Sequence, residues 1–257
     1  MKRITILLLL LLVLTLTSCA STGTICDQVR EIPRKECMAL VTFYHATGGE
    51  EWKDRRGWNE ITEPCDWYGV GCDGGHVTSV TLNYNYMTGT LPPELGDLKH
   101  LEMLVLYFNE IGGPIPPELG STSLQVLILH NNNLSGQIPA SFGQLEDMVK
   151  IDLENNELEG PIPPELGNLA KLEVLILRSN NLSGEIPVEL ANCQNLTGVM
   201  ISNNQLSGVV PEELGSMPNL RMFSVRGNPI TLPLPGNLPY LAESGYDWFS
   251  EGIADDD

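Results

Sequence analysis

The side chains best suited to acid–base chemistry are those of His130 and Glu154, which are 24 residues apart. A histidine beside a carboxylate can exchange protons near neutral pH, so this pair is considered first. Catalysis also needs further reactive groups that converge in one cleft. The sequence contains no Ser-His-Asp constellation, no metal-ligand spacing and no phosphate-binding loop. We therefore predict that the protein is not an enzyme, with no metal and no cofactor, and that both residues belong to a polar part of a binding surface.

The separation of that pair is also the period of a repeat, whose most regular member is an asparagine. It recurs at Asn85, Asn109, Asn132, Asn156, Asn180, Asn204 and Asn228, with spacings of 24, 23, 24, 24, 24 and 24 residues. The frame around it is clearest as Leu172-x-x-Leu175-x-Leu177-x-x-Asn180, followed by Gly184-x-Ile186-Pro187. A pattern of this kind at this period predicts a solenoid of stacked coils.

Each position of the repeat has an expected structural role. The Leu-x-x-Leu-x-Leu segment alternates apolar and variable residues, so we expect a short strand whose Leu175 and Leu177 point inward. The asparagine can bond to backbone groups that the following turn would otherwise bury unpaired, forming a ladder from coil to coil. The recurring glycine and proline turn every coil at the same place. The remaining residues are too few for more than a helical turn or 3₁₀ segment.

The Gly-x-Ile-Pro element resembles the plant-specific class of leucine-rich repeats, found in plant receptor kinases, polygalacturonase-inhibiting proteins and bacterial relatives. The resemblance covers residues 77–235, with about seven repeats, the last of which degrades after Asn228. It implies an α/β solenoid: a right-handed superhelix with a parallel concave β-sheet, short helical or 3₁₀ convex segments and an N-terminal helical cap. The second repeat is one residue short at Gly120-Ser121-Thr122-Ser123, and we expect this deletion to fall on the convex side.

The N-terminus predicts export. Lys2 and Arg3 precede an apolar run from Ile6 to Leu14, which is too short for a membrane-spanning helix. Leu16-Thr17-Ser18-Cys19 resembles a bacterial lipobox, which implies a signal peptide at 1–18 and lipidation of Cys19, with anchoring to the cell membrane or the outer membrane. Cleavage near Ala20 and secretion is the alternative.

The charge of the chain excludes one class of partner. The formal net charge is −19, from 33 acidic against 14 basic residues, and removal of residues 1–18 takes away two of the basic ones. Such a surface is unsuited to nucleic acid and repels anionic polymers. Acidic residues recur in the Pro-Glu-Leu turns and at the C-terminal Asp255-Asp256-Asp257, where they favour solubility.

Residues 33–76 are expected to cap the solenoid, after a lipid-anchored linker at 19–32. An amphipathic helix is predicted from Pro33 to Ala46, and the Cys65-x-Trp67-x-Gly69-Val70-x-Cys72 segment resembles the cap that precedes plant-type repeats. We pair Cys65 with Cys72 and Cys26 with Cys37, because each pair is local and lies in the capping segment. Cys193 is expected to be a small buried residue. Residues 236–257 form either a C-terminal cap or a tail.

The variable strand residues define the expected ligand-binding face. Each strand segment has two outward-facing variable positions, two residues apart, such as Met103 and Val105. Most residues at these positions are apolar, and an exposed apolar stripe of this length argues for a protein or peptide partner. Four aromatic residues gather at the N-terminal end of this face: Tyr84, Tyr86, Tyr107 and Phe108. Aromatic residues are enriched in binding hot spots and in sugar stacking. The alternative is that β-propensity alone explains them. The predicted site comprises Tyr84, Tyr86, Met103, Val105, Tyr107, Phe108, Ile128, His130, Asp152, Glu154, Ile176, Arg178 and Met200.

We therefore predict a lipid-anchored, non-enzymatic recognition module that binds a protein, peptide or glycan. A structural or adhesive surface lipoprotein that self-associates, and a secreted protein similar to the enzyme inhibitors of the family, are the alternatives.

Overall fold

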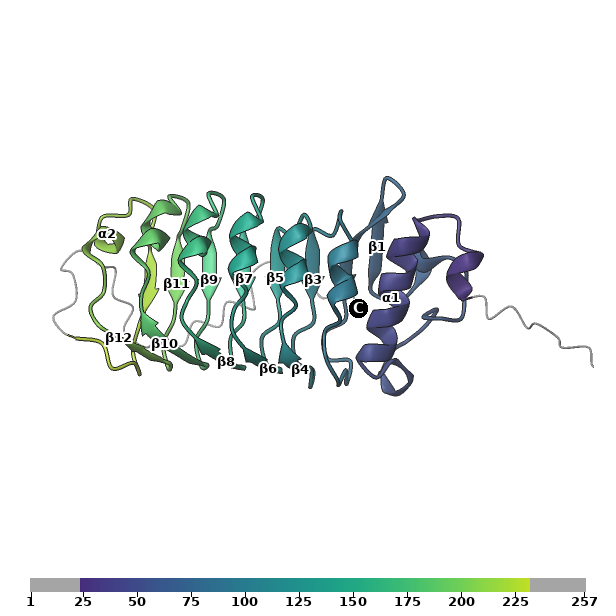
Figure 1. The fold of residues 1–257 in the computed structure, drawn as a ribbon, viewed down its shortest axis with the longest axis horizontal. Coiled ribbons are helices and arrows are strands. Elements are labelled where there is room, and N and C mark those ends of the chain that lie inside the picture. The colour runs from purple at the N-terminus through teal and green to yellow at the C-terminus, as the bar shows by residue number, and fades with distance from the viewer. Residues whose placement is uncertain (1–23, 232–257) are drawn as a thin grey trace, which may run out of the picture.

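The computed structural model describes residues 24–231, which fold into a single stack of coils preceded by a cap (Figure 1). The signal peptide, Cys19, the first part of the linker and residues 232–257 with the predicted C-terminal cap or tail lie outside the described residues. The solenoid expected from the repeat is confirmed. In Figure 1 the strands of the larger sheet stand side by side along the stack, with one short helical segment in front of each coil.

The larger sheet has eight strands, and all of its pairs are parallel except the first. In spatial order they are β1 (Val70–Asp73), β2 (His76–Thr81), β3 (Met103–Val105), β5 (Val126–Ile128), β7 (Lys150–Asp152), β9 (Val174–Ile176), β11 (Gly198–Met200) and β13 (Met222–Ser224). From β2 onward each strand belongs to one coil of the repeat, and the pairing keeps equivalent residues side by side, as with Val126, Lys150 and Val174. We call the outward-facing side of this sheet the concave face.

A second parallel sheet and a row of 3₁₀ segments complete each coil. The second sheet contains β4 (Gly112–Pro114), β6 (Asn133–Gly136), β8 (Glu157–Gly160), β10 (Asn181–Glu185) and β12 (Gln205–Ser207). The convex segments are η4 (Pro93–Asp97), η5 (Pro117–Ser121), η6 (Ala140–Gln144), η7 (Pro164–Asn168), η8 (Val188–Asn192) and the short helix α2 (Glu212–Gly215). The one-residue deletion after Gly120 lies where η5 ends, on the convex side as predicted. The register from β3 to β5 is undisturbed.

The predicted asparagine ladder is present and holds the coils together. Asn156 donates through Nδ2 to the carbonyl oxygens of Leu153 in its own coil and Leu129 in the preceding one, both at 3.1 Å. Its Oδ1 accepts from the backbone N–H of Leu134 at 3.0 Å. One buried amide therefore bonds to backbone groups of two coils and pairs the Leu134 N–H, which would otherwise lie unpaired in the core. The same set of bonds recurs at Asn132, Asn180 and Asn204.

The cap is built as the sequence predicts. Helix α1 (Arg34–Ala46) ends before Gly48, whose φ of 71° only glycine adopts readily. Around it lie η1 (Ile25–Asp27), η2 (Gly49–Glu51) and η3 (Pro64–Asp66). Trp52, Trp58 and Trp67 are buried and their rings pack on one another, so they form the core of the cap.

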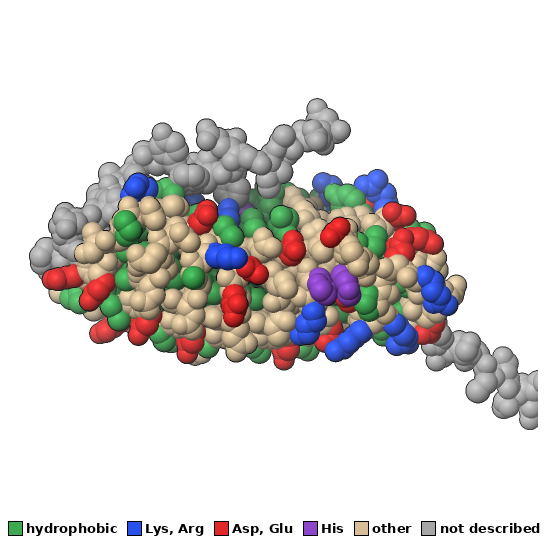
Figure 2. All heavy atoms as spheres, turned by 90° about the horizontal axis from the view of Figure 1, so that it is seen from above, with side chains coloured by type: hydrophobic (Ala, Val, Ile, Leu, Met, Phe, Trp, Pro, Cys, Tyr) green, Lys and Arg blue, Asp and Glu red, His purple; other side chains and the backbone are tan. Residues whose placement is uncertain are grey.

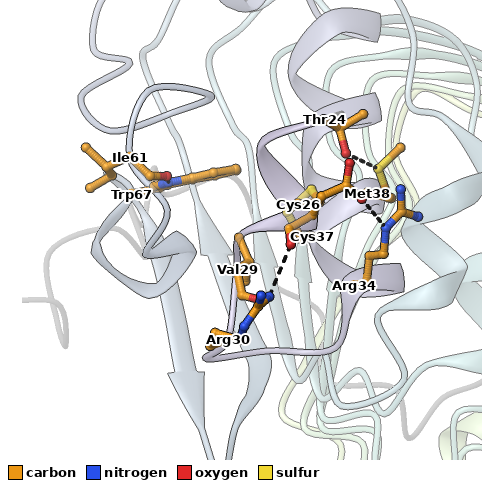
Figure 3. The surroundings of a disulfide bond; sticks show 10 residues. Thr24, Cys26, Val29, Arg30, Arg34, Cys37, Met38, Ile61 and Trp67 are labelled. Carbon is orange, nitrogen blue, oxygen red and sulfur yellow. Dashed lines mark hydrogen bonds and ion pairs between the residues drawn. A yellow bond between two sulfur atoms is a disulfide. The ribbon is translucent and has the colours of Figure 1, made fainter. Parts of the chain in front are cut away.

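Two disulfides close the cap, between Cys26 and Cys37 and between Cys65 and Cys72, which are the predicted pairs. Figure 3 shows the first of them tying η1 to α1, with Arg34 reaching back from the start of the helix. Cys193 is free and buried, and its Sγ donates to the carbonyl oxygen of Leu166. Burial raises the pKa of this thiol to about 11, so it is a packing residue as expected.

A buried carboxylate joins the cap to the first coil. Glu36 of α1 is only 4% exposed, and its Oε2 accepts from the backbone N–H of Val77 at 2.8 Å. Its Oε1 lies 2.7 Å from Nδ1 of His76. These contacts replace the hydrogen bonds that Glu36 would make to water, which is the condition for burying a carboxylate.

The acidic residues elsewhere are dispersed over the face seen in Figure 2 and form no single patch there.

Candidate functional site

One residue in every coil has left-handed backbone geometry, and it lies directly before the ladder asparagine. The φ angles of its six non-glycine members lie between 53° and 55°: Tyr84, Phe108, Asn131, Asn155, Ser179 and Asn203, with Gly227 as the seventh. We call these residues the left-handed row. Asparagine and glycine tolerate this geometry, whereas a bulky L-residue is strained in it by roughly 1–2 kcal/mol. The first two coils nevertheless place aromatic residues there.

The strained aromatic residues form one end of a compact cluster. The rings of Tyr84 and Phe108 stack with centroids 4.6 Å apart. Tyr107 and His130 make a second stack, also at 4.6 Å, and the two stacks meet edge to face at 5.4 Å. We call these four residues the aromatic cluster. The sequence placed all four on one surface, and the structure brings them into contact.

Exposure within the aromatic cluster is graded. Tyr84 is 51% and Phe108 43% exposed, Tyr107 is half-buried, and His130 is buried. Tyr86 lies two residues after Tyr84, also has positive φ, and is 65% exposed. Large apolar side chains this exposed are candidates for partner contact when they cluster. The outer rim of the aromatic cluster is therefore open to a ligand, while His130 supports it from below.

The apolar stripe expected next to this cluster is largely absent as an exposed surface. Met103 is 40% exposed, but Val105, Ile128, Ile176 and Met200 are all less than a tenth exposed. The expectation of a long exposed stripe was therefore wrong. The physical reason is the close spacing of parallel strands, about 4.8 Å, which lets longer outward side chains cover the shorter ones beside them.

The middle of the concave face carries charge. Arg178 forms an ion pair with Glu154 at 2.5 Å, and Lys150 Nζ lies 3.9 Å from Oδ2 of the fully buried Asp152. Burial is the main cause that raises the pKa of Asp152 to about 6. Burial, and then the positive charges of Lys150 and Arg178, lower the pKa of His130 to about 4. At neutral pH His130 is therefore uncharged, and its ring serves as an aromatic surface.

The pairing of Glu154 differs from the one considered in the sequence. Glu154 contacts Arg178, and the ring of His130 stacks on Tyr107 while its Nδ1 lies 2.7 Å from the Asn131 amide.

In residues 24–231 no group of three or more His, Cys, Asp or Glu side chains is arranged to hold a metal ion. The described helices also include none that is long and apolar enough to span a bilayer.

Two features of the site were not found from the sequence. One is the left-handed geometry of Tyr84 and Phe108, for which a signal existed, because other coils carry Asn directly before the ladder residue, as in Asn155-Asn156. The other is the burial of Asp152. A period-two pattern places it outward but does not show how far its neighbours cover it.

Comparison with protein families identifies the repeat. A family model described as "Leucine rich repeat" matches residues 122–182 and 171–230, and a second model of the same description matches residues 100–122. Together they span more than half of the 257 residues.

Individual proteins are similar over different lengths. The receptor-like kinase TMK4 of Arabidopsis thaliana is 40% identical over 45 residues, which are 18% of this chain and 5% of that protein. The structure of PEPR1-AtPEP1 superposes with a TM-score of 0.70 at 29% identity, covering 80% of this chain and 31% of that one. A plant ice-binding protein superposes with a TM-score of 0.70 at 28% identity, over 78% of this chain and 73% of the other. The chain thus spans less than a third of TMK4 and of the PEPR1 chain.

Proposed function

This chain belongs to the leucine-rich repeat family, and we propose that it is a non-enzymatic recognition module, lipid-anchored through Cys19 at the cell envelope. It binds a protein, peptide or glycan at the N-terminal end of the concave face. The similar proteins include a receptor-like kinase and an ice-binding protein, so similarity to them does not by itself name the ligand of this chain.

One observation carries the location of the site: Tyr84 and Phe108 are exposed aromatic residues on strained backbone. Residues in sparsely populated φ regions persist where the surrounding structure holds them, and they cluster at binding sites. Asparagine in the same position of other coils shows that the fold itself does not require an aromatic ring there. The strain is therefore consistent with a function that needs the rings.

The test of the binding site uses the mature chain without its lipid, screened against peptidoglycan, polysaccharide and surface-proteome arrays. The variant Tyr84→Asn/Phe108→Asn replaces both rings by the residue that the left-handed row carries elsewhere. We expect at least a tenfold loss of capture by this variant. The matched control is Val209→Asn, which removes another exposed apolar side chain, 62% exposed and outside the concave sheet.

One result would count against this site, and two others would favour the alternative functions. Equal capture by both variants would remove the aromatic cluster from the binding surface. Capture of no ligand together with concentration-dependent self-association would favour the adhesive alternative. Saturable inhibition of a secreted enzyme by the soluble chain would favour the inhibitor-like alternative.

The lipid anchor is tested separately. In a bacterial host that processes lipoproteins, the full chain should incorporate labelled palmitate and fractionate with membranes, and Cys19→Ala should abolish both. Release of unlabelled wild-type chain into the medium would instead support cleavage near Ala20 and secretion.

A further inference from the structure

Asp152 is the only acidic residue among the equivalent positions of the concave strands β3 to β13, where the other coils carry Val105, Ile128, Ile176, Met200 and Ser224. Its neighbour Ile151 points into the core, so the alternation of the strand directs the Asp152 side chain to the concave face. The side chain is nevertheless completely buried among its neighbours.

One oxygen of this carboxylate has no hydrogen-bond donor. Oδ1 of Asp152 accepts from the backbone N–H of Glu154 at 3.3 Å. Within the described part of the chain, no group donates a hydrogen bond to Oδ2. A buried charged oxygen without a donor is costly, and native proteins keep few of them. Its retention calls for a donor that arrives from outside the described fold.

The charged side chains around Asp152 do not supply that donor. Lys150, on the same strand, holds Nζ 3.9 Å from Oδ2, which is beyond hydrogen-bond distance. Arg178, from the next coil, is engaged with Glu154. His130, from the preceding coil, is the fourth titratable group here, and it is neutral because its pKa is lowered to about 4. The Lys150 side chain is 31% exposed, so a ligand group that reaches Oδ2 would have to displace it.

We infer that Asp152 is the subsite for a basic group, an ammonium or a guanidinium, on an extended peptide whose aromatic side chain packs against the aromatic cluster. Either group would donate the missing hydrogen bond to Oδ2 and neutralise the buried charge. This inference rests on the proposed function, because it names the ligand class for the same concave face. The net charge of the chain, −19, would also attract a basic peptide during encounter.

The distance between the two subsites sets the spacing in the peptide. Phe108 follows β3 and Asp152 ends β7, with β5 alone between them. Two strand spacings are about 10 Å, which an extended chain covers in about three residues. A ligand that crosses the strands would therefore carry its aromatic and basic residues about three positions apart.

The experiment uses the full mature chain and synthetic probes. Acetylated, amidated peptides carry one Phe and one Arg separated by one to five positions, and each has a twin in which citrulline replaces Arg. Citrulline keeps the shape of the side chain but removes its charge. At the best spacing we expect the Arg peptide to bind at least ten times more tightly than its twin, as measured by calorimetry. In Asp152→Asn this preference should fall to less than twofold.

A control variant separates the subsite from general attraction. Glu165→Gln also removes one negative charge, but from an exposed convex turn. It should keep the tenfold preference, whereas an equal loss in both variants would reduce the effect to overall charge and overturn the subsite. Thermal melting of Asp152→Asn checks that the variant is folded.

The remaining outcomes are also decisive. Equal affinity for the Arg and citrulline peptides, or no binding of any peptide in the series, would overturn the role of Asp152. Capture of another ligand that still depends on Tyr84 and Phe108 would, in that case, leave the proposed function standing. If no ligand is captured in a way that depends on the aromatic cluster, both the Asp152 subsite and the proposed function are overturned.

Discussion

Two rows of residues run side by side along the solenoid, one position apart in the sequence. The ladder row is asparagine in all seven coils, from Asn85 to Asn228. The left-handed row directly before it shares one backbone geometry but holds five residue types, from Tyr84 to Gly227. The ladder side chains are mostly buried and bond to the backbone of two coils, whereas Tyr84, Phe108, Asn155 and Asn203 of the other row are exposed.

The difference shows which residues the fold requires and which it leaves free. A ladder side chain must donate twice and accept once in a space without water, and among neutral side chains of this size asparagine does so. A residue of the left-handed row must only tolerate positive φ. Its identity can therefore follow function, and the aromatic choice in the first two coils marks the end of the concave face where we place the ligand.

The largest expected effect comes from removing the ladder side chain of one coil, compared with a substitution at its neighbour in the left-handed row. Asn156→Ala removes bonds to the carbonyls of Leu129 and Leu153, which keep those from Asn132 and Asn180, and leaves the Leu134 N–H buried without its partner. We expect a loss of about 3 kcal/mol in the free energy of unfolding, measured by urea denaturation. Asn155→Gly, its neighbour, retains the favoured geometry at φ 53° and should cost less than about 0.5 kcal/mol. Similar losses in both variants would erase the distinction between the rows.

The buried charges of the concave face should give opposite pH trends. Burial raises the pKa of Asp152 from 3.8 to about 6, so the folded chain holds this proton more tightly than the unfolded one. The resulting destabilisation is absent below about pH 4 and complete above about pH 6. His130, whose pKa is lowered from 6.5 to about 4, has the reverse effect, since stability falls as the pH drops from about 6.5 to 4.

Single substitutions should separate these trends. Asp152→Asn should stabilise the fold at pH 7 by about 2 kcal/mol and leave a stability that rises from pH 4 to 6.5. His130→Gln should leave a stability that falls over about pH 4 to 6. Chemical denaturation at a series of pH values measures both. A variant Asp152→Asn that is less stable than wild type at pH 7 would contradict the burial of an unsatisfied carboxylate.

The smallest expected effect on stability belongs to the aromatic members of the left-handed row. Tyr84→Asn/Phe108→Asn relieves backbone strain of roughly 1–2 kcal/mol per residue and loses ring contacts worth about 0.5–1.5 kcal/mol each. These contributions nearly cancel, so the free energy of unfolding should stay within about 1 kcal/mol of wild type while ligand capture falls. A loss of several kcal/mol would show instead that the rings are structural.

Much of the fold follows from spacing because every coil repeats the same local problem. The period of the asparagine placed the strands, the Gly and Pro placed the turns, and the Cys-x-Trp-x-Gly-Val-x-Cys segment placed a disulfide-closed cap, all as the structure has them. The aromatic residues were likewise assigned to one surface, because equivalent positions of a solenoid lie side by side. The membership of Met103, Ile176 and the other residues in a ligand site stays a prediction.

Burial on the concave face could not be obtained this way. The alternation that placed Val105 and Ile128 outward says which side of the sheet a side chain leaves, but exposure depends on its neighbours in adjacent coils. The partner of Glu154 is a similar case. His130 and Arg178 both lie one coil away from it, and only the packed structure selects Arg178.

The sequence by itself determined the stack of coils, its cap and the ladder that joins them, because these depend on contacts repeated at a fixed period. The tertiary structure decided which outward side chains stay exposed, that Tyr84 and Phe108 bear left-handed strain, and that Asp152 is buried with one oxygen lacking a donor. Those properties arise where unlike residues of neighbouring coils meet, and a repeat pattern, which records what the coils share, carries no information about their differences in packing.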